Sequence, residues 1–252
     1  MRDARVIPIL LLHNGGLYKT IKFKEARYIG DPINTIRIFN DLEVDEIIFL
    51  DIDASKFGRG PNFELIEELV SEAFMPVSYG GGIRELADAE RIFRCGVEKI
   101  IINRRFIEKP EFIKECAVQF GSQSIVVSFD YMIDRNGLRL HFDHVVNRAV
   151  ESLVMGVVKL AEDLGAGEVF LNCVDNDGVM SGVDVRFIEE VAGNIGIQII
   201  ACGGVGNLNH ILEAYRAGAN GIAAGSFFVY RGRKNGVLIS YPSQKILDNL
   251  FK

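Results

Sequence analysis

The most constraining feature of this 252-residue sequence is an internal repeat with one fixed separation. The segment Glu-Ile-Ile-Phe-Leu-Asp-Ile-Asp begins at Glu46, and its counterpart Glu-Val-Phe-Leu-Asn-Cys-Val-Asp begins 122 positions later at Glu168. Three further pairs keep this separation: Gly80-Gly-Gly-Ile with Cys202-Gly-Gly-Val, Gly96 with Gly218, and Asn103 with Gly225. Chance resemblance between apolar segments would let the separation drift. The repeat therefore predicts two half-units of strand–helix–strand–helix, as in a duplicated half-barrel.

Short runs rich in Ile, Val and Leu alternate with amphipathic segments along the chain. Such nearly continuous apolar runs are typical of parallel strands covered on both faces. Strands are expected near Val6–Leu12, Glu46–Ile52, Pro76–Tyr79, Lys99–Asn103, Ser124–Asp130, Glu168–Val174, Gln198–Cys202 and Gly221–Gly225. Helices are expected at Asp31–Glu43, Asn62–Ala73, Glu85–Gly96, Pro110–Gly121, Ala149–Gly165, Val185–Gly193 and Asn209–Gly218. This alternation predicts a single (β/α)8 TIM barrel with a two-fold half-barrel repeat, spanning residues 1–252 as one domain. An open doubly wound sheet is the alternative, which the repeat disfavours.

Composition limits the classes of function. The net charge of −6 disfavours a general nucleic-acid binder. No run of about 18 apolar residues occurs, and the segment from Met1 to Arg5 lacks the apolar core of a signal peptide, so we expect a cytoplasmic protein without a membrane span. Neither the cysteines nor the histidines have metal-ligand spacing, and no metal or cofactor is expected. These residues are Cys95, Cys116, Cys173, Cys202, His13, His141, His144 and His210.

Glycines follow several of the expected strands. Because barrel active sites lie at the carboxyl ends of the strands, these positions are candidate ligand contacts. The runs containing Gly81, Gly82, Gly203 and Gly204 allow backbone N–H groups to approach an anion. Gly225 and Ser226 lead into the last expected helix, whose N-terminus suits phosphate. The sequence predicts a phosphate site here, although such glycines also occur in simple tight turns.

Three other features of this end could bind or transform a substrate. Asp130 closes an apolar run, where a carboxylate suits acid–base catalysis, binding of a hydroxyl, or capping of the next turn. Asp175 and Asp177 are a candidate ligand-binding pair or turn formers. A long basic loop follows the first strand and either folds over an anionic substrate or lies on the solvated surface. Its cations are Lys19, Lys22, Lys24 and Arg27.

Four charged residues stand at the opposite, amino ends of strands. They are Arg5, Glu46, Lys99 and Glu168. Two cations and two anions at the bottom of a barrel are expected to pair into a ring. A purely structural salt-bridged plug is the alternative, because this face of such barrels usually serves stability.

Together these residues resemble the cyclase subunit of imidazole glycerol phosphate synthase, the HisF type. The resemblance covers almost the whole chain and is clearest at Arg5–Pro8, Gly30–Pro32, Phe49–Ile52, Tyr79–Arg84, Phe120–Ser124, Leu164–Glu168, Asp175–Gly178 and Ala201–Gly204. It implies that a separate, HisH-like glutaminase subunit docks on the barrel bottom. Ammonia then crosses a charged gate and travels through the barrel to a phosphorylated substrate. The gate matches the four charges above, and Glu98, where Asp is usual, is implied to face the glutaminase.

The carboxyl end departs from the family pattern. Of the two expected catalytic aspartates, Asp130 matches the second, but Leu11 replaces the first and cannot transfer a proton. The Thr-His-Gly-Gly segment is replaced by residues 141–146, a small hydroxyl residue by Arg104, and an arginine by Asn176. One phosphate site, which includes Gly81, Gly82 and Asn103, is therefore altered. The other matches the family at Asp177, Gly178, Gly203, Gly204, Gly225 and Ser226.

Other segments resemble a subgroup associated with acetamidino modification of nucleotide-activated sugars in surface-polysaccharide synthesis. These segments are Pro8–Thr20, Phe49–Ala54 and Val237–Ser243. The resemblance implies ammonia delivery to a nucleotide sugar with a third, amidotransferase-like protein, and Lys19 and Asp130 as retained active-face residues. An authentic histidine-pathway cyclase is the rival and requires His13 or Asp51 to replace the missing acid. A non-catalytic scaffold that activates its glutaminase is a third hypothesis.

Overall fold

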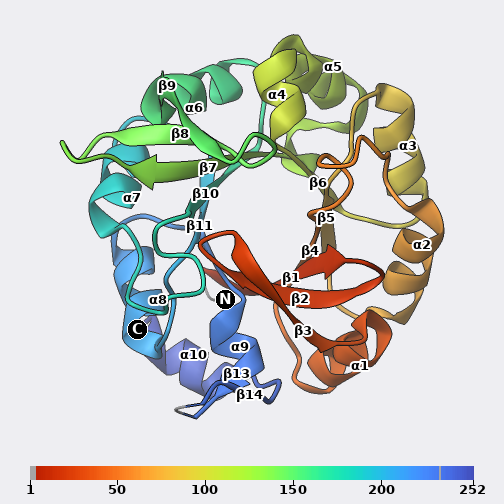
Figure 1. The fold of residues 1–252 in the computed structure, drawn as a ribbon, viewed down its shortest axis with the longest axis vertical. Coiled ribbons are helices and arrows are strands. Elements are labelled where there is room, and N and C mark those ends of the chain that lie inside the picture. Colours follow the sequence, from red (N-terminus) through yellow and green to blue (C-terminus); the bar gives the residue numbers. More distant parts are fainter. Residues whose placement is uncertain (1–3, 233) are drawn as a thin grey trace.

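The computed structural model describes residues 4–232 and 234–252, and within them eight parallel strands form a closed barrel. These strands are β1 (Arg5–His13), β4 (Ile47–Asp51), β5 (Val77–Gly80), β6 (Lys99–Ile102), β7 (Ile125–Ile133), β10 (Glu168–Cys173), β11 (Gln198–Cys202) and β12 (Gly221–Ala224). Each pairs with the next in the chain, and β12 pairs with β1 to close the ring (Figure 1). The predicted (β/α)8 barrel is confirmed. Residues 1–3, part of the segment examined for a signal peptide, lie outside the described residues.

Helices surround the barrel and return the chain to the bottom of each following strand (Figure 1). Several begin at a side chain that caps the first turn: Asp31 accepts a hydrogen bond from the backbone of Asn34 at 2.9 Å, and Asn62 from that of Leu65 at 3.2 Å. The helices are α1 (Pro32–Asp41), α2 (Phe63–Glu72), α3 (Leu86–Arg94), α4 (Arg104–Glu108), α5 (Glu111–Phe120), α6 (Val154–Asp163), α7 (Val185–Ala192), α8 (Leu208–Arg216), α9 (Ser226–Val229) and α10 (Gln244–Leu250), with a 3-10 turn, η1 (Ser122–Ser124).

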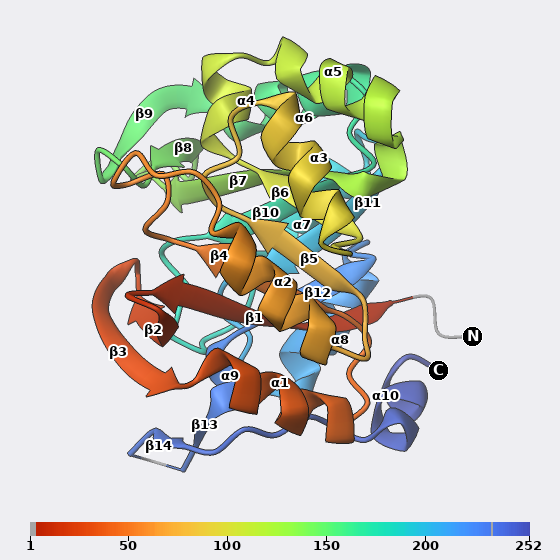
Figure 2. The same cartoon turned by 90° about the vertical axis from the view of Figure 1, so that its right-hand side faces the viewer.

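Two hairpins extend from the carboxyl end of the barrel, and the sequence analysis anticipated neither. The expected loop after the first strand is the hairpin β2 (Gly16–Ile21) and β3 (Lys24–Gly30). The expected helix Ala149–Gly165 was wrong at its start, because β8 (Arg139–Asp143) pairs with β9 (Arg148–Leu153) and α6 begins only at Val154. Figure 2 shows both hairpins at one end of the barrel and the C-terminus at the other. A short ribbon, β13 (Tyr230–Arg231) with β14 (Gly236–Val237), follows α9.

The strands bury side chains on both faces. Their outward side chains join the helices in a large apolar core, and their inward side chains form a second cluster along the barrel axis. This inner cluster comprises Ile7, Ile9, Ile48, Ile101, Val126, Phe170, Ile200, Cys202 and Ala223. Polar inward side chains occupy the layers above and below it. Among the described residues, no helix has the length and apolarity needed to cross a bilayer.

Candidate functional site

A cavity of about 680 Å³ opens at the carboxyl ends of the barrel strands. We call it the upper cavity. The structure brings eleven predicted residues of this end to its wall: Lys19, Gly81, Gly82, Asn103, Asp130, Asp177, Gly178, Gly203, Gly204, Gly225 and Ser226. Leu11, Asp51, Arg104 and His144 line it as well. Side chains far apart in the sequence therefore share one site of a size suited to a small-molecule ligand.

The wall formed by β11 and β12 has glycines at positions where no side chain fits. Gly204 has a φ of +103°, and a Cβ there would overlap the carbonyl oxygen of Gly182. At Gly225 the space of a Cβ is occupied by the ammonium group of Lys19, which is only 4% exposed. Ser226 begins α9, which has only four residues. The sequence analysis expected the last helix here, but α10 follows it. This wall therefore combines the ammonium group of Lys19 with glycine backbone, and the short helix α9 adds little helix dipole.

The wall formed by β5 and β6 differs at the matching positions. Gly81 and Gly82 have φ values of +119° and +75°, so backbone close approach is retained. Arg104, however, stands where Ser226 stands in the repeat, and its Nε donates to Oε1 of Glu108 at 2.7 Å. A guanidinium lining the cavity replaces a small hydroxyl. The two repeated walls are thus chemically different.

Asp130 is held in a fixed position at the wall of the upper cavity. It is 7% exposed, and its two oxygens accept hydrogen bonds from Nδ2 of Asn103 and Nδ2 of Asn172, each at 2.9 Å. Nδ1 of His144 lies 3.6 Å from the Asn103-bound oxygen. The strand β7 continues past Asp130 to Ile133, so this carboxylate does not cap a turn as the alternative proposed. Its partners come from three other strands or hairpins and fix its direction toward the cavity.

The two predicted aspartates after β10 have separate surroundings. Oδ2 of Asp175 accepts the backbone N–H of Ile133 at 2.8 Å and joins the ends of β7 and β10. Asp177 lines the cavity, and Oδ2 accepts from the hydroxyl of Thr20 at 3.1 Å. Burial raises the pKa of Asp177, against the lowering effects of Lys19 and Thr20. Only Asp177 is therefore placed to contact a ligand.

Neither alternative acid to Leu11 is free. Nδ1 of His13 lies 2.7 Å from Oδ1 of Asp53, and His13 is not part of the cavity wall. Asp51 reaches the wall, but Oδ1 accepts the backbone N–H groups of Asp53 at 2.9 Å and Ala54 at 3.0 Å. Burial raises the pKa of Asp51 against these hydrogen bonds. Leu11 itself lines the cavity as an apolar side chain.

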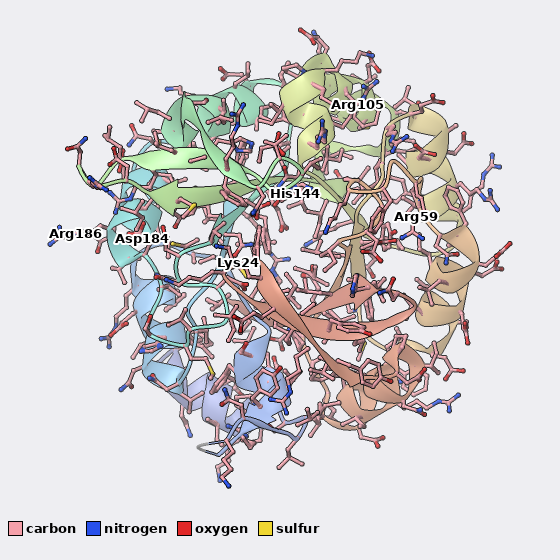
Figure 3. All side chains as sticks on the ribbon, viewed as in Figure 1. Lys24, Arg59, Arg105, His144, Asp184 and Arg186 are labelled. Atoms are coloured by element: carbon pink, nitrogen blue, oxygen red, sulfur yellow. The ribbon has the colours of Figure 1, made fainter. Side chains whose placement is uncertain are left out.

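The sequence analysis placed four cations in a loop after the first strand. Of these four, only Lys19 lines the upper cavity. Lys22 and Lys24 are exposed around the turn of the β2–β3 hairpin, and Arg27 donates to the carbonyl of Asn235 at 3.1 Å. Figure 3 shows Lys24 on this hairpin above the barrel mouth. The ring of Phe23, at the same turn, contacts Phe142 of β8 with centroids 5.7 Å apart. The two hairpins therefore meet over the cavity.

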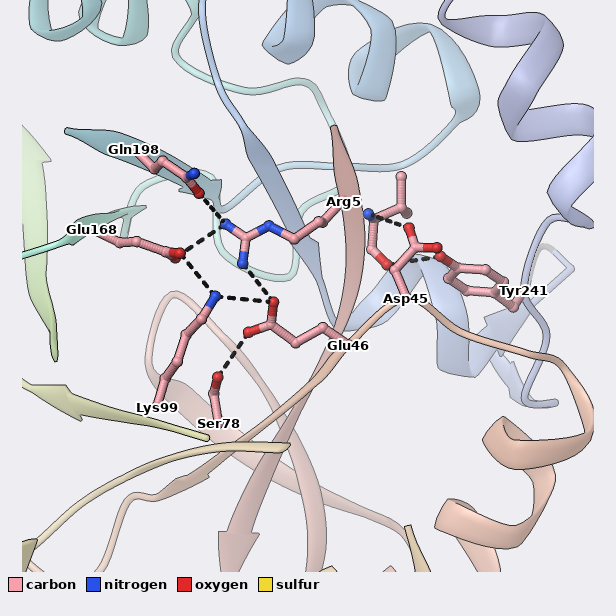
Figure 4. Close-up of polar contacts among 9 residues, drawn as sticks. Arg5, Asp45, Glu46, Ser78, Lys99, Glu168, Gln198 and Tyr241 are labelled. Atoms are coloured by element: carbon pink, nitrogen blue, oxygen red, sulfur yellow. Dashed lines mark hydrogen bonds and ion pairs between the residues drawn. The ribbon is translucent and has the colours of Figure 1, made fainter. Parts of the chain in front are cut away.

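At the amino ends of the strands the four predicted charges form a closed ring, which we call the charged ring (Figure 4). Arg5 contacts Glu46 at 2.6 Å and Glu168 at 3.1 Å. Lys99 contacts Glu168 at 2.8 Å and Glu46 at 3.6 Å. Each cation thus lies between the same two carboxylates, as the strand-start positions predicted.

Further hydrogen bonds support the charged ring. Ser78 donates to Oε1 of Glu46 at 2.7 Å, and Oε1 of Gln198 accepts from Arg5 at 3.1 Å. Burial acts to lower the pKa of Arg5, but Glu46 and Glu168 raise it above its ordinary value. The carboxylate side chains are 3% and 7% exposed, so both need these partners to offset their desolvation.

A second cavity of about 580 Å³ lies beneath the charged ring. We call it the lower cavity. Exposed Glu98 lines it, together with Arg5, Lys99, Gln123, Ser124, Gly167, Glu168 and Gln198. Above the ring, five side chains of the inner apolar cluster do not line the upper cavity, and we call them together the apolar layer: Ile7, Ile48, Val126, Phe170 and Ile200. Along the axis, the order is therefore lower cavity, charged ring, apolar layer and upper cavity.

The sequence analysis missed several contributors to these sites. His144 appeared there only among the histidines without metal-ligand spacing and within the replaced segment, and Thr20, Ser78 and Gln198 were not proposed as site residues. The alternation of apolar and polar residues in Leu140–Phe142, followed by Asp143, was a signal of a strand that ends just before His144. Within the described residues, no group of three or more His, Cys, Asp or Glu side chains is arranged to hold a metal ion.

Comparison with known proteins agrees with this geometry. Residues 5–234 match the family described as histidine biosynthesis protein. A Pseudomonas aeruginosa protein, provisionally named imidazole glycerol phosphate synthase subunit hisF2, is 46% identical over 98% of this chain and 99% of its own length. A Leptospira borgpetersenii protein, provisionally named the HisF subunit, is 45% identical over the full length of both chains. The imidazole glycerol phosphate synthase subunit HisF of Corynebacterium glutamicum is 34% identical over 90% of each chain. The chain therefore belongs to the histidine biosynthesis protein family and is a homologue of the HisF subunits of imidazole glycerol phosphate synthase.

Proposed function

We propose that this protein is the synthase subunit of a glutamine amidotransferase. It receives ammonia from a HisH-like glutaminase at the lower cavity and conducts it through the barrel to an acceptor in the upper cavity. The observation that carries this proposal is the axial order of two cavities with the charged ring and the apolar layer between them. A structural plug alone would need neither cavity.

The charged ring would act as a gate, because its charges are all paired when it is closed. Lys99 is 17% exposed and Arg5 25%, whereas both carboxylates are deeper, so displacement of a cation toward the lower cavity opens the ring. The apolar layer above it admits neutral ammonia and strongly disfavours ammonium, because an unpaired charge is costly to bury. Exposed Glu98, beside Lys99, is a suitable contact for the glutaminase.

The acceptor would be held by the upper cavity through a phosphate or diphosphate. Lys19 and the open backbone at Gly204 and Gly225 provide a cation and N–H donors on one wall. Gly81, Gly82 and Arg104 provide a second anion-binding wall with different chemistry. Two such walls across one cavity suit a diphosphate ester, and we propose a nucleotide sugar whose acetamido group becomes an acetamidino group during surface-polysaccharide synthesis. A third, amidotransferase-like protein would activate that acetamido group.

A histidine-pathway cyclase is the second candidate, because the fixed carboxylate of Asp130 and the glycine walls suit that family's chemistry. It is disfavoured by Leu11 and by the engagement of His13 and Asp51 in other hydrogen bonds. Losing one positioned proton-transfer group typically costs about 10²–10⁴ in rate.

The test is nitrogen transfer in the assembled complex. The protein is purified with candidate glutaminases, and amide-¹⁵N glutamine is supplied with unlabelled ammonium chloride in the medium. We expect ¹⁵N in an amidinated uridine-diphosphate 2-acetamido sugar when ATP and the third protein are present. Product carrying mainly medium nitrogen would contradict conduction through the barrel. Glutaminase activation without any product would favour the scaffold hypothesis, and formation of imidazole glycerol phosphate would favour the cyclase.

A further inference from the structure

The turn between β8 and β9 carries His144 to the mouth of the barrel. Oδ1 of Asp143 accepts the backbone N–H groups of Val145 at 2.8 Å and Val146 at 3.1 Å, which fixes the turn around the histidine. His144 lines the upper cavity, and its side chain is 25% exposed. Figure 3 shows it inside the ring of strands, away from the outer helices. The hairpin therefore delivers an imidazole into the cavity.

Asp130 gives this imidazole a defined neighbour. Because Asn103 and Asn172 each donate to one of its oxygens, the carboxylate cannot rotate to follow a mobile partner. Nδ1 of His144 lies 3.6 Å from Oδ2, a distance that shortens to a hydrogen bond with a small movement of the hairpin. A carboxylate at Nδ1 favours the tautomer that carries its proton there, and leaves the lone pair of Nε2 to accept a proton.

The surrounding charges favour the protonated ring. Burial acts to lower the pKa of His144, but Asp130 and, to a lesser extent, Asp143 raise it above its ordinary value, with Arg104 opposing them. His141, on the same hairpin, is buried, and burial lowers the pKa of that second imidazole. These groups come from β7, from α4 and from the hairpin itself.

We propose that His144, oriented by Asp130, is a proton-transfer group of the upper cavity. The proposal rests on the proposed function in that ammonia is the nucleophile. As ammonia forms a bond to the electrophilic carbon of the acceptor, its nitrogen becomes positively charged and must lose a proton. Nε2 of neutral His144 accepts that proton, and Asp130 stabilises the imidazolium. An ATP-dependent partner has activated the oxygen on this carbon beforehand. The C–O bond breaks, its electrons stay on the oxygen, and the proton passes from the imidazolium to the released oxygen group.

The pairing is tested without any acceptor, by NMR titration of the full chain labelled with ¹³C-histidine. Single His→Gln variants assign the four resonances. We expect the pKa of His144 to lie above the ordinary value of about 6.5. Asp130→Asn should lower it, and Arg104→Gln should raise it, because the guanidinium opposes protonation. A His144 pKa that is unchanged in Asp130→Asn would overturn the proposal.

The role in turnover is tested in the complex with glutaminase and third protein, using a uridine-diphosphate 2-acetamido sugar, ATP and ammonium chloride. At a constant concentration of free ammonia, His144→Gln should lower the rate by about 10²–10⁴ and remove the loss of rate that protonation of the imidazole causes at low pH. His210→Gln, a histidine outside the cavity, is the matched control. Wild-type rates in His144→Gln at every pH would overturn the proposal. If the wild type does not convert this acceptor, the proposed function fails for this sugar. The titration still tests whether Asp130 orients His144.

Discussion

The two ends of this barrel hold their charges in opposite ways. At the lower end each charge of the ring lies between two opposite charges, and the four contacts span 2.6–3.6 Å. At the upper end the ammonium group of Lys19 forms no ion pair among the described residues, and burial raises the pKa of Asp177. The comparison teaches that the charges of the ring are all paired with one another, whereas the buried ammonium group of Lys19 in the upper cavity has no such partner among the described residues.

The largest effect is expected from breaking the closed end. Lys99→Ala removes one cation and leaves Glu46 and Glu168 with Arg5 alone. Glutamine-dependent product formation should fall by about 5–150-fold, the size of a typical coupling between two sites, while turnover supported by ammonium chloride remains. Exposed Lys159→Ala on α6 is the charge-matched control. Normal glutamine-dependent turnover in a folded Lys99→Ala complex would leave the ring with a structural role only.

The next largest effect is expected on the phosphate affinity of the upper cavity. Gly225→Ala would place a methyl group where the ammonium of Lys19 now lies. Displacing that cation should weaken binding of inorganic phosphate by about 1.5–3 kcal/mol, the contribution of a hydrogen bond to a charged group. Isothermal titration at fixed ionic strength measures this change.

Gly60→Ala is the control for that measurement, because nothing lies within 4 Å of a Cβ there. It should leave phosphate affinity unchanged. Equal affinity of Gly225→Ala and wild type would show that phosphate does not use this wall.

The sequence predicted the charged ring better than the upper cavity, for a physical reason. A residue at the start of a parallel strand has a position fixed by the barrel, so four charged strand starts were sufficient to predict the ring. The upper cavity also depends on hairpins whose strands are partly exposed and have no continuous apolar run, such as Lys24–Gly30. Their patterns overlap with those of loops and helix starts. The contact of His144 with Asp130 follows from the hairpin register, which no local signal determines.

A smaller effect is expected from Asp177→Asn. The folded-state pKa of Asp177 is raised, so its contribution to stability is present at acid pH and is lost as pH rises through that pKa. Replacing it by a neutral isostere should therefore stabilise the unliganded protein at pH 7 and raise its Tm. The gain should shrink as the pH approaches the ordinary range of aspartate. Exposed Asp163→Asn is the control, and a lower Tm for Asp177→Asn at pH 7 would contradict the prediction.

The smallest effect is expected from restoring the missing acid. Leu11→Asp adds a carboxylate to the upper cavity, but Arg104 still lines the altered wall and His144 still lies beside Asp130. A single carboxylate changes one proton-transfer group and leaves the geometry that binds and orients the substrate unchanged, and orientation accounts for a large share of catalysis. Neither the wild type nor Leu11→Asp should rescue growth of a histidine cyclase-deficient strain without histidine. Rescue by the wild type would overturn the proposed acceptor. Rescue by Leu11→Asp but not by the wild type would show that the missing acid alone prevents the cyclase reaction in the upper cavity.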